Sequence, residues 1–440
     1  MTIPRILVAG THSGCGKTTI ASGIMAALTA RGYAVQPFKV GPDFIDPSHH
    51  SAICGRTSRN LDAFMMGEQG VVNTFTSACK GADMAVIEGV MGLYDGLEGT
   101  DTASTAHVAK LLGAPVILVV DVGAMSRSAS ALVKGFKEFD PEVDISGVIF
   151  NRIGGEGHRR MIEPSMPARP LGWIPYEKGV YVKSRHLGLN MAVEADGMKQ
   201  AGEVLEKHCD LDGILGIARQ SGELTVPVQP ESGTRQDIKI GIAMDDAFCF
   251  YYRDNFDRLI EAGAELVFFS PMKERLPSVD AVYLGGGYPE LHAEQLESSP
   301  CREDIRSAVD DGMPVYAECG GLMYLTEGIE TDRVHKMAGV LPGRAVMTKK
   351  LQALGYVEAK AVSGPLFNHG TEYLGHEFHF STVECDCDAR FAIQMARGKG
   401  IGNGRDGMYE HNAIGTYTHA YFTRELAQSV VDSARKYRKT

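Results

Sequence analysis

The chain has 440 residues, of which 44% are hydrophobic and 22% are charged, and its formal net charge is −11. This length favours two or three domains, each large enough to bury its own core. The acidic balance offers no basic footprint for nucleic acid, and no apolar run approaches the roughly 18 residues that span a bilayer. We therefore expect a multidomain globular protein with neither nucleic acid nor a membrane as a partner.

The amino-terminal stretch and the cysteines bear on location. The opening, MTIPRILVAGTHSG, lacks a basic segment and a small-residue cleavage site, so it predicts a first strand and not a signal peptide. The nine cysteines form an odd, scattered set, which suits a reducing compartment better than a disulfide framework. We therefore predict a cytoplasmic protein.

The first part of the chain, residues 3–175, alternates short apolar runs with helix-like stretches. The candidate strands are RILVAG, AVQPFKV, MAVIEGV, PVILVVDV and ISGVIFNR. Such runs between helices indicate an α/β domain with a mostly parallel sheet that is covered on both faces. Functional side chains are then expected at the carboxyl ends of the strands.

A polar stretch containing Pro, Gly and Ser, RQSGELTVPVQPESGTRQD, interrupts this pattern. We predict a first domain over residues 1–220, a linker over 221–237 and a second α/β domain over 238–440. The second domain begins with IKIGIA and continues with AELVFFSP, AVYLGGGYPE and MPVYAECGG. From about residue 340 it becomes richer in short strands and loops.

A glycine-rich loop, THSGCGKTT at residues 11–19, joins the first strand to a helix whose apolar positions are Ile20, Ile24, Ala27 and Leu28. Small residues let backbone N–H groups surround phosphate oxygens, a lysine reaches the β- and γ-phosphates, and a hydroxyl binds Mg²⁺. The usual first glycine is replaced by Thr11, and Gly10 lies one residue earlier. The residues that we assign to ATP are Gly14, Cys15, Gly16, Lys17, Thr18, Thr19 and Lys39.

Two acidic segments accompany the loop, FKVGPDFIDP with Asp43 and Asp46 and VIEGVMGLYDG with Glu88 and Asp95. A carboxylate at a strand end beside a P-loop can hold Mg²⁺, and a nearby lysine can neutralise a transferring phosphoryl group. Backbone capping is the alternative for each aspartate in a turn. We assign metal binding to Thr18, Asp46 and Glu88, and substrate binding or phosphoryl transfer to Asp43, Asp46 and Asp95.

A cysteine, Cys319 in MPVYAECGGLMYL, lies between an apolar strand and an amphipathic stretch, and two glycines follow it. A sharp strand-to-helix turn exposes a nucleophile, and adjacent N–H groups can form an oxyanion hole. His419, at the end of a short β-like run, is the expected base. The oxyanion donors that we expect are Gly286, Gly287 and Gly320. A buried core thiol is the alternative.

Several other residues allow two interpretations. Cys385 and Cys387 form a CxC pair without a second metal-spaced pair, so zinc is disfavoured. The pair His49-His50 could contact substrate or lie in a loop. Glu377 and His379 in GHEFHFS alternate on one strand, and we favour a face of a site over a solvated face.

Seven segments together resemble the cobyrinate a,c-diamide synthase family: GTHSGCGKTT, FKVGPDFIDP, EGVMGLYDG, YLGGGYPE, YAECGGLMYL, KLQALGYVEA and GHEFHFS. The resemblance covers nearly the whole chain. It implies a dethiobiotin-synthetase-like ATPase domain followed by a class I glutamine amidotransferase domain of flavodoxin-like α/β fold. It also implies amidation of the a and c acetates of a corrinoid precursor, or of nickel-sirohydrochlorin in the coenzyme F430 route.

The resemblance also implies partners and roles. ATP, glutamine and a tetrapyrrole carboxylate would be the substrates, Mg²⁺ the cofactor, and a homodimer is an assembly by analogy with related ATPases. Cys319 would form a glutamyl thioester with His419 as its base. Tyr421 stands two residues after His419, where many glutaminases carry Glu, so no orienting third residue is assigned.

The mechanism that we expect joins two half-reactions. ATP converts a carboxylate into an acyl phosphate, while Cys319 and His419 release ammonia from glutamine. Because free ammonia protonates readily in water, we expect its path to be shielded. Two alternatives stay open: a synthase of the cobyric acid type, which amidates other corrin carboxylates, and a partitioning ATPase, which is disfavoured because His12 stands where that class carries a signature lysine.

Overall fold

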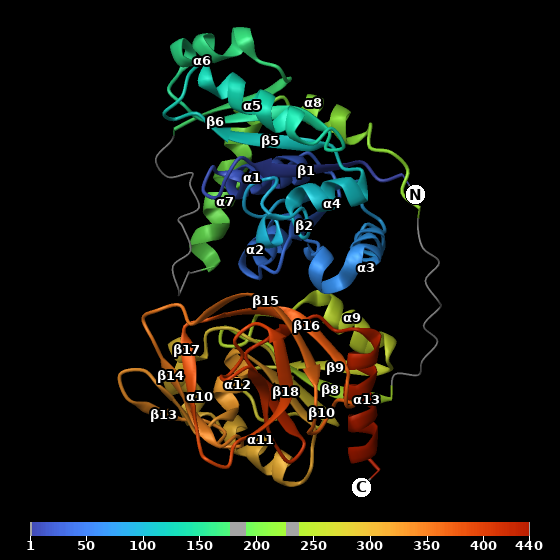
Figure 1. Ribbon diagram of the computed structural model, residues 1–440, viewed down its shortest axis with the longest axis vertical. Coiled ribbons are helices and arrows are strands. Elements are labelled where there is room, and N and C mark those ends of the chain that lie inside the picture. The colour runs from blue at the N-terminus through green and yellow to red at the C-terminus, as the bar shows by residue number, and fades with distance from the viewer. Residues whose placement is uncertain (1, 177–190, 226–236, 440) are drawn as a thin grey trace. The chain divides into compact units, whose positions relative to one another are not determined.

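The computed structural model describes residues 2–176, 191–225 and 237–439. The chain divides into two compact units, Met1–Gln229 and Pro230–Thr440. Figure 1 draws unit 1 in blue to green and unit 2 in yellow to red. The predicted linker includes residues 226–236, which lie outside the described residues.

Unit 1 is built on a parallel sheet in the order β3-β2-β4-β1-β5-β6-β7. The strands are β1 (Arg5–Gly10), β2 (Val35–Val40), β3 (Arg59–Leu61), β4 (Met84–Glu88), β5 (Val116–Asp121), β6 (Ile145–Ile153) and β7 (Pro170–Pro175). All five predicted strands are confirmed. Two further strands were not predicted: β3, which has three residues, and β7, which begins and ends with proline.

Helices cover both faces of this sheet, as the continuous apolar runs predict. Successive residues of β1 point to opposite faces, and Ile6 and Val8 join a different core cluster from Leu7 and Ala9. The first cluster also contains residues of α1 (Lys17–Ala30), α7 (Met191–His208) and α8 (Leu211–Ala218). The second contains residues of α3 (Ala63–Ala78), α4 (Thr105–Leu112) and α5 (Ser128–Phe139). The remaining helices are α2 (Ile45–Cys54) and α6 (Glu156–Ile162), with 3₁₀ turns at Leu97–Gly99 and Glu163–Ser165.

Unit 2 has a parallel core in the order β9-β8-β10-β11-β20. Numbered along the chain, these five strands follow the order 2-1-3-4-5 of flavodoxin-like folds, so that prediction is confirmed. Their bounds are β8 (Ile238–Ala243), β9 (Ala264–Phe269), β10 (Ala281–Leu284), β11 (Val315–Glu318) and β20 (Ala413–Thr416).

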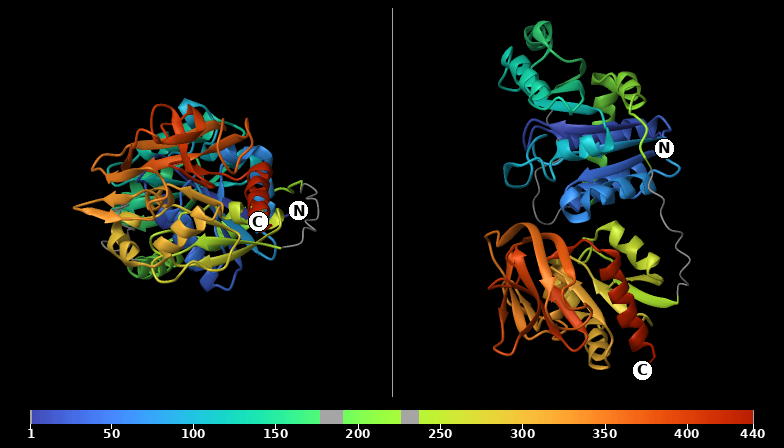
Figure 2. Two further views of the ribbon diagram at one scale, coloured as in Figure 1. Left: turned by 90° about the horizontal axis from the view of Figure 1, so that it is seen from below. Right: turned by 45° about the vertical axis from the view of Figure 1, so that its right-hand side comes forward.

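An antiparallel extension continues the sheet beyond β20. It comprises β19 (Arg405–Glu410), β18 (Arg390–Arg397), β15 (Ala353–Ala361), β16 (Glu372–His379) and β21 (His419–Ala420). A second sheet contains β12 (Gly328–Glu330), β13 (Val334–Lys336), β14 (Gly343–Met347) and β17 (Ser381–Cys385). In Figure 1, β13, β14 and β17 lie on the side of unit 2 opposite α13, and the right-hand view of Figure 2 shows the same arrangement.

The helices of unit 2 lie on both faces of the parallel core. Residues of α9 (Arg253–Glu261) and α13 (Arg424–Tyr437) pack in one cluster, and residues of α10 (Ala293–Ser298), α11 (Cys301–Asp310) and α12 (Gly320–Leu325) in the other. A 3₁₀ turn covers Pro289–His292. The prediction of an amphipathic stretch after Cys319 is wrong, because every residue of α12 is buried between β11, β20 and β12.

Candidate active sites

The glycine loop of unit 1 follows the carboxyl end of β1 and ends where α1 begins. Gly14 (φ 83°) and Gly16 (φ 98°) have left-handed backbones, which favour glycine. An added Cβ on Gly10 would lie 2.4 Å from the Cys15 Sγ. Gly10 therefore leaves room for the side chain of Cys15 at the end of β1. In the usual pattern, the glycine that leaves such room stands at the position of Thr11. Thr18 and Thr19 lie in the first turn of α1, where an anion is favoured.

An asparagine that the sequence analysis did not assign holds this loop. Asn151, in β6, donates from Nδ2 to the carbonyl of Cys15 at 2.9 Å, and an added Cβ on Gly16 would lie 2.1 Å from the same nitrogen. The next residue, Arg152, pairs with Asp121 at the end of β5. Both are polar residues near the carboxyl end of a parallel strand, so the rule that singled out Glu88 could also have found them.

Four predicted residues of unit 1 meet in one buried cluster. Lys39 Nζ lies 3.1 Å from both Glu88 Oε1 and Asp46 Oδ2, and it donates to the carbonyl of Gly89 at 2.9 Å. The hydroxyl of Thr18 donates to Glu88 Oε1 at 2.6 Å. The structure thus brings Thr18, Lys39, Asp46 and Glu88 together beside the loop.

The charges of the cluster support one another. Burial opposes the charge on Lys39, but Glu88 and Asp46 outweigh burial and raise the pKa of Lys39. Burial alone would raise the pKa of Glu88, whereas Lys39 lowers it overall. Burial and the charge of Lys39 lower the pKa of Lys17. Lys39 is therefore a fixed cation between two carboxylates, and Lys17 gains most from an arriving anion.

A histidine extends the cluster. His50 Nε2 lies 2.8 Å from Glu88 Oε2, and His50 follows Asp46 by one helical turn on α2. The loop reading of the pair His49-His50 is wrong, because both lie in α2 and both are buried. His50 contacts the cluster through Glu88.

Asp43 and Asp95 make the capping contacts that the alternative reading expected. Asp43 Oδ1 accepts from the amide of Ile45 at 2.9 Å, and Asp95 Oδ2 accepts from the amide of Gly92 at 2.8 Å. Asp43 also contributes to the raised pKa of Lys39, after burial, Glu88 and Asp46. The charge of Asp43 therefore acts on Lys39 in the cluster, whereas Asp95 contacts the nearby backbone of Gly92.

The oxygen atoms of Thr18, Asp46 and Glu88 are the kind of donor that Mg²⁺ prefers. Within the described residues, however, no group of three or more His, Cys, Asp or Glu side chains could hold a metal ion. The three donors fit Mg²⁺ only if phosphate oxygens of the nucleotide complete its coordination, as is usual for this ion.

The candidate nucleophile of unit 2 lies on a sharp turn. Cys319 joins β11 to α12 with φ 46° and ψ −98°, and its amide donates to the carbonyl of Thr416 at 2.6 Å. An added Cβ would lie 2.9 Å from Pro289 Cδ at Gly320 and 2.4 Å from the carbonyl oxygen of Leu284 at Gly321. The two glycines therefore let the chain turn directly after the cysteine, and the strained backbone holds the thiol at the strand end.

The predicted base begins β21, which follows β20 in the chain. β11 pairs with β20, so Glu318 is opposite Thr416, three residues before His419. The imidazole of His419 lies against the backbone of Gly286, because an added Cβ there would be 2.3 Å from His419 Cε1. The sheet therefore brings the Cys319 turn, the glycine loop and His419 to one edge.

The oxyanion prediction differs at one of its three positions. The amide of Gly286 donates to the carbonyl of Phe250 at 3.3 Å, so Gly286 serves as the surface under His419 and not as an oxyanion donor. The amide nitrogen of Gly287 lies 3.2 Å from the Cβ position of Gly320. The amide of Gly320 also favours the thiolate of Cys319. Gly287 and Gly320 stay the predicted oxyanion donors.

The resting charges of this site are set by burial. Burial, helped by the charges of Glu290 and Glu318 and opposed by the amide of Gly320, raises the pKa of Cys319 to about 12. Burial lowers the pKa of His419 to about 3. The pair therefore rests as neutral thiol and neutral imidazole, and substrate binding must favour the proton transfer between them.

Glu377 and His379 of the segment GHEFHFS make different kinds of contact. Glu377 accepts from the amides of Lys399 at 2.6 Å and Gly400 at 3.0 Å, and this shows a loop-holding role in place of the favoured site face. His379 stacks on Tyr417 with ring centroids 3.7 Å apart. His376, directly before Glu377 on β16, is the cross-strand neighbour of His419.

Comparisons with known proteins agree with this pair of sites. Residues 6–187 match the model of the CobQ/CobB/MinD/ParA nucleotide binding domain, and residues 239–427 match that of the CobB/CobQ-like glutamine amidotransferase domain. A protein of Methanosarcina barkeri named cobyrinate a,c-diamide synthase is 43% identical to this chain, and the match covers 99% of this chain and 97% of that protein. A protein of the same name in Listeria monocytogenes is 42% identical, and the match covers 96% of this chain and 97% of that protein. The chain belongs to the cobyrinate a,c-diamide synthase family. Like the family, it is an ATP-dependent, glutamine-hydrolysing amidoligase.

Two further comparisons complete the description. The Archaeoglobus fulgidus member of the family is 43% identical and covers 99% of this chain and 98% of its own length. A solved structure described as "Structure of PurLQS from Thermotoga maritima" covers 46% of this chain and 99% of its own, with 14% identity and a TM-score of 0.35, which is too weak a likeness to bear on function. In the part of the chain that the structure describes, no helix has the length and apolarity needed to cross a membrane.

Proposed function

We propose that this member of the family amidates the a and c acetates of a tetrapyrrole, with cobyrinate as the first candidate acceptor. The observation that carries the proposal is the presence, in one chain, of a phosphate loop beside the Lys39 cluster and of a cysteine turn beside His419. A carboxylate needs activation and a nitrogen source before it becomes an amide. Each half-site meets one of these needs.

Activation would take place in unit 1. A carboxylate oxygen of the acceptor attacks the γ-phosphorus of ATP, the bond to the bridging oxygen breaks, and ADP leaves as an acyl phosphate forms. Lys17 binds the β- and γ-phosphates, while Lys39, fixed by Glu88 and Asp46, offsets the charge that develops during transfer. Ammonia then attacks the acyl carbon, and inorganic phosphate leaves.

Mg²⁺ would be held by Thr18, Glu88 and Asp46 together with the nucleotide, and it would neutralise charge on the phosphates. Glu88 has a second task, because its contacts with Lys39 and His50 fix the orientation of its carboxylate. Asp43 and Asp95 stay predictions as groups that position the acceptor. Asn151 keeps the loop in the shape that receives phosphate.

Ammonia would be released in unit 2. The Sγ of Cys319 attacks the side-chain carbonyl of glutamine, His419 takes the thiol proton and passes it to the departing nitrogen, and ammonia leaves. The amides of Gly287 and Gly320 would donate to the oxygen that becomes negative. Water then cleaves the thioester, which gives glutamate and restores the thiol.

A Cys319→Ser variant tests the assignment of the two half-sites. We expect glutamine hydrolysis to fall by roughly 10³-fold or more, since serine is far less nucleophilic in the same turn, while amidation driven by ammonium chloride continues. The measurement is the rate of glutamate release beside the rate of amide formation from each nitrogen source. Wild-type glutamine hydrolysis in Cys319→Ser would refute the assignment, and Cys249→Ser, on an exposed thiol, is the matched control.

A second acceptor, nickel-sirohydrochlorin, presents similar acetates. The family name of the relatives favours a corrinoid for this chain. Separate incubations with each tetrapyrrole, ATP and glutamine, read by mass, distinguish the two acceptors. Amidation of other corrin carboxylates would instead indicate a synthase of the cobyric acid type.

A further inference from the structure

Glu318, the residue before Cys319, has an environment that the proposed mechanism does not use. It ends β11, it is 1% exposed, and both its oxygens are engaged. Oε1 accepts from the hydroxyl of Tyr316 at 2.9 Å and from the amide of Ala420 at 2.9 Å. Oε2 accepts from the hydroxyl of Tyr283 at 2.8 Å. These three donors favour the ionised carboxylate and oppose the burial that raises the pKa of Glu318.

The same carboxyl group joins the nucleophile to its base. Glu318 is bonded covalently to Cys319, and its contact with the amide of Ala420 fixes the residue that follows His419. Oε2 lies 4.0 Å from Nδ1 of His419, on a side chain that is itself 3% exposed. This is longer than a hydrogen bond, but catalytic hydrogen bonds are often long before substrate binds.

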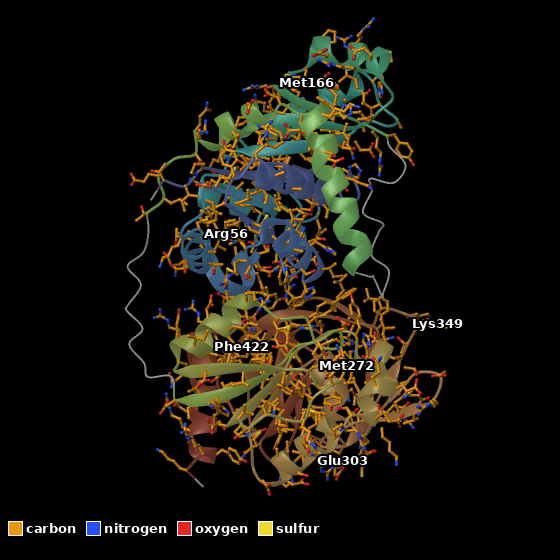
Figure 3. The ribbon with its side chains drawn as sticks, turned by 180° about the vertical axis from the view of Figure 1, so that it is seen from behind. Arg56, Met166, Met272, Glu303, Lys349 and Phe422 are labelled. Carbon is orange, nitrogen blue, oxygen red and sulfur yellow. The ribbon has the colours of Figure 1, made fainter. Side chains whose placement is uncertain are left out.

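The surrounding rings keep Glu318 from turning away. Phe422, labelled in Figure 3, stacks on Tyr283 with ring centroids 5.4 Å apart, and Tyr283 lies 5.3 Å from Tyr316. The hydroxyl of Tyr316 also contacts that of Tyr373 on β16, the strand that pairs with β21. The rings and the three donors therefore hold the carboxyl group beside His419 and leave it little freedom to move elsewhere.

We propose that Glu318 is the positioning acid of His419, acting from the nucleophile's own strand in place of an acid two residues after the histidine. The inference rests on the proposed glutaminase site. Glu318 holds the proton of the neutral imidazole on Nδ1, so that Nε2 is free to accept the thiol proton. When Cys319 gives up that proton, the carboxylate stabilises the imidazolium, and no proton moves to Glu318.

The titratable groups around this pair identify which one a pH profile would report. Tyr251, Tyr283, Tyr316 and Tyr373 face Glu318, and burial raises the pKa of each well above its usual value, so all stay neutral. His376 and His379 face His419, and burial lowers the pKa of each to about 4. Near neutral pH the candidates are Glu318, whose pKa burial raises to about 8, Glu290 at about 7 and Asp406 at about 6, both near Cys319.

The first test is Glu318→Gln in the full chain, assayed for glutamine hydrolysis from pH 5.5 to 9.5. Because activity requires the carboxylate, we expect wild-type kcat/KM to rise with pH through the pKa of Glu318. The variant should lose roughly 10²-fold in kcat, keep its KM for glutamine, and lose this rise. A denaturant unfolding curve beside that of the wild type reports whether unit 2 is folded, and amidation from ammonium chloride in the same samples reports whether unit 1 is intact.

The second test moves the pKa without removing the carboxylate. Tyr283 lowers the pKa of Glu318, so Tyr283→Phe should raise it and shift the rise in kcat/KM to higher pH. Glu290→Gln and Asp406→Asn are the matched controls, in which the rise should persist at its wild-type position. Tyr283→Phe also keeps the inference testable if Glu318→Gln does not fold.

The outcomes distinguish a failure of the positioning role of Glu318 from a failure of the glutaminase assignment. The positioning role would be overturned if Glu318→Gln kept the wild-type kcat. It would also be overturned if the rise of kcat/KM with pH stayed in place in Tyr283→Phe but disappeared in Glu290→Gln or in Asp406→Asn. If Cys319→Ser hydrolysed glutamine normally, the glutaminase assignment would fail first.

Discussion

At the scale of single residues, the two sites differ in how charge is handled. In unit 1, Lys39 is surrounded by carboxylates and stays charged, whereas in unit 2 burial leaves Cys319 and His419 neutral. The first site therefore stands ready for phosphate, and the second must wait for glutamine. This difference suits an enzyme that should not hydrolyse glutamine in an idle state.

The ion cluster makes a prediction about stability. Lys39→Met leaves Glu88 and Asp46 buried without their cation, so we expect the free energy of unfolding to fall by about 3–5 kcal/mol. Glu88→Gln added to Lys39→Met should recover part of this loss without recovering amidation. Denaturant titration measures both changes.

The control for this prediction is an exposed ion pair. Lys134 lies 3.7 Å from Glu138, and both side chains are more than half exposed. Lys134→Met should change stability by less than about 1 kcal/mol. Equal losses in Lys39→Met and Lys134→Met would contradict the account of the cluster.

The sequence predicted some site residues and missed others for identifiable reasons. Lys17 and Cys319 stand in local patterns whose geometry follows from neighbouring residues. Glu318 lies beside Cys319 in the sequence, but its partners come from β10 and from β21, and no local pattern states which strands will adjoin β11. Gly286 was assigned the wrong role because its amide is satisfied by Phe250, a residue more than thirty positions away.

At the scale of elements, strands with long β-branched runs were predictable and short polar strands were not. β1 and β5 are almost entirely apolar, whereas β3 is Arg-Asn-Leu and owes its strand conformation to pairing with β2. The pairing of β20 with β11 joins segments about a hundred residues apart. Tertiary contacts, which local sequence does not encode, decide such elements.

The turn from β1 into the phosphate loop depends on the absence of a side chain at Gly10. Gly10→Ala places a methyl group against Cys15 Sγ, so we expect the loop to shift and ATP affinity to fall by roughly tenfold or more. Gly10→Ala combined with Cys15→Ala removes the obstructing sulfur and should recover part of the affinity. Nucleotide titration of both variants provides the measurement.

A helix glycine without such a neighbour is the control. Gly216 lies within α8, and an added Cβ there would meet no atom within 4 Å. Gly216→Ala should leave ATP affinity unchanged and raise stability by up to about 1 kcal/mol. ATP affinity in Gly10→Ala equal to that of Gly216→Ala would contradict the account of the loop.

At the scale of the whole molecule, two units with separate cores carry two half-reactions. The family models match each unit separately, and the relatives match the chain across almost its full length. The division of labour was predictable because each half carries its own motif. The homodimer stays a prediction, since it concerns contacts beyond one chain.

The most direct measurement of the central claim follows the amide nitrogen of glutamine. The full chain is incubated with cobyrinate, ATP and glutamine labelled in its side-chain amide nitrogen, and the tetrapyrrole is analysed by mass. We predict a product with labelled amides at the a and c acetates, formed only with ATP and absent when Cys319→Ser replaces the wild type. Consumption of ATP and glutamine with the tetrapyrrole unlabelled would contradict the claim.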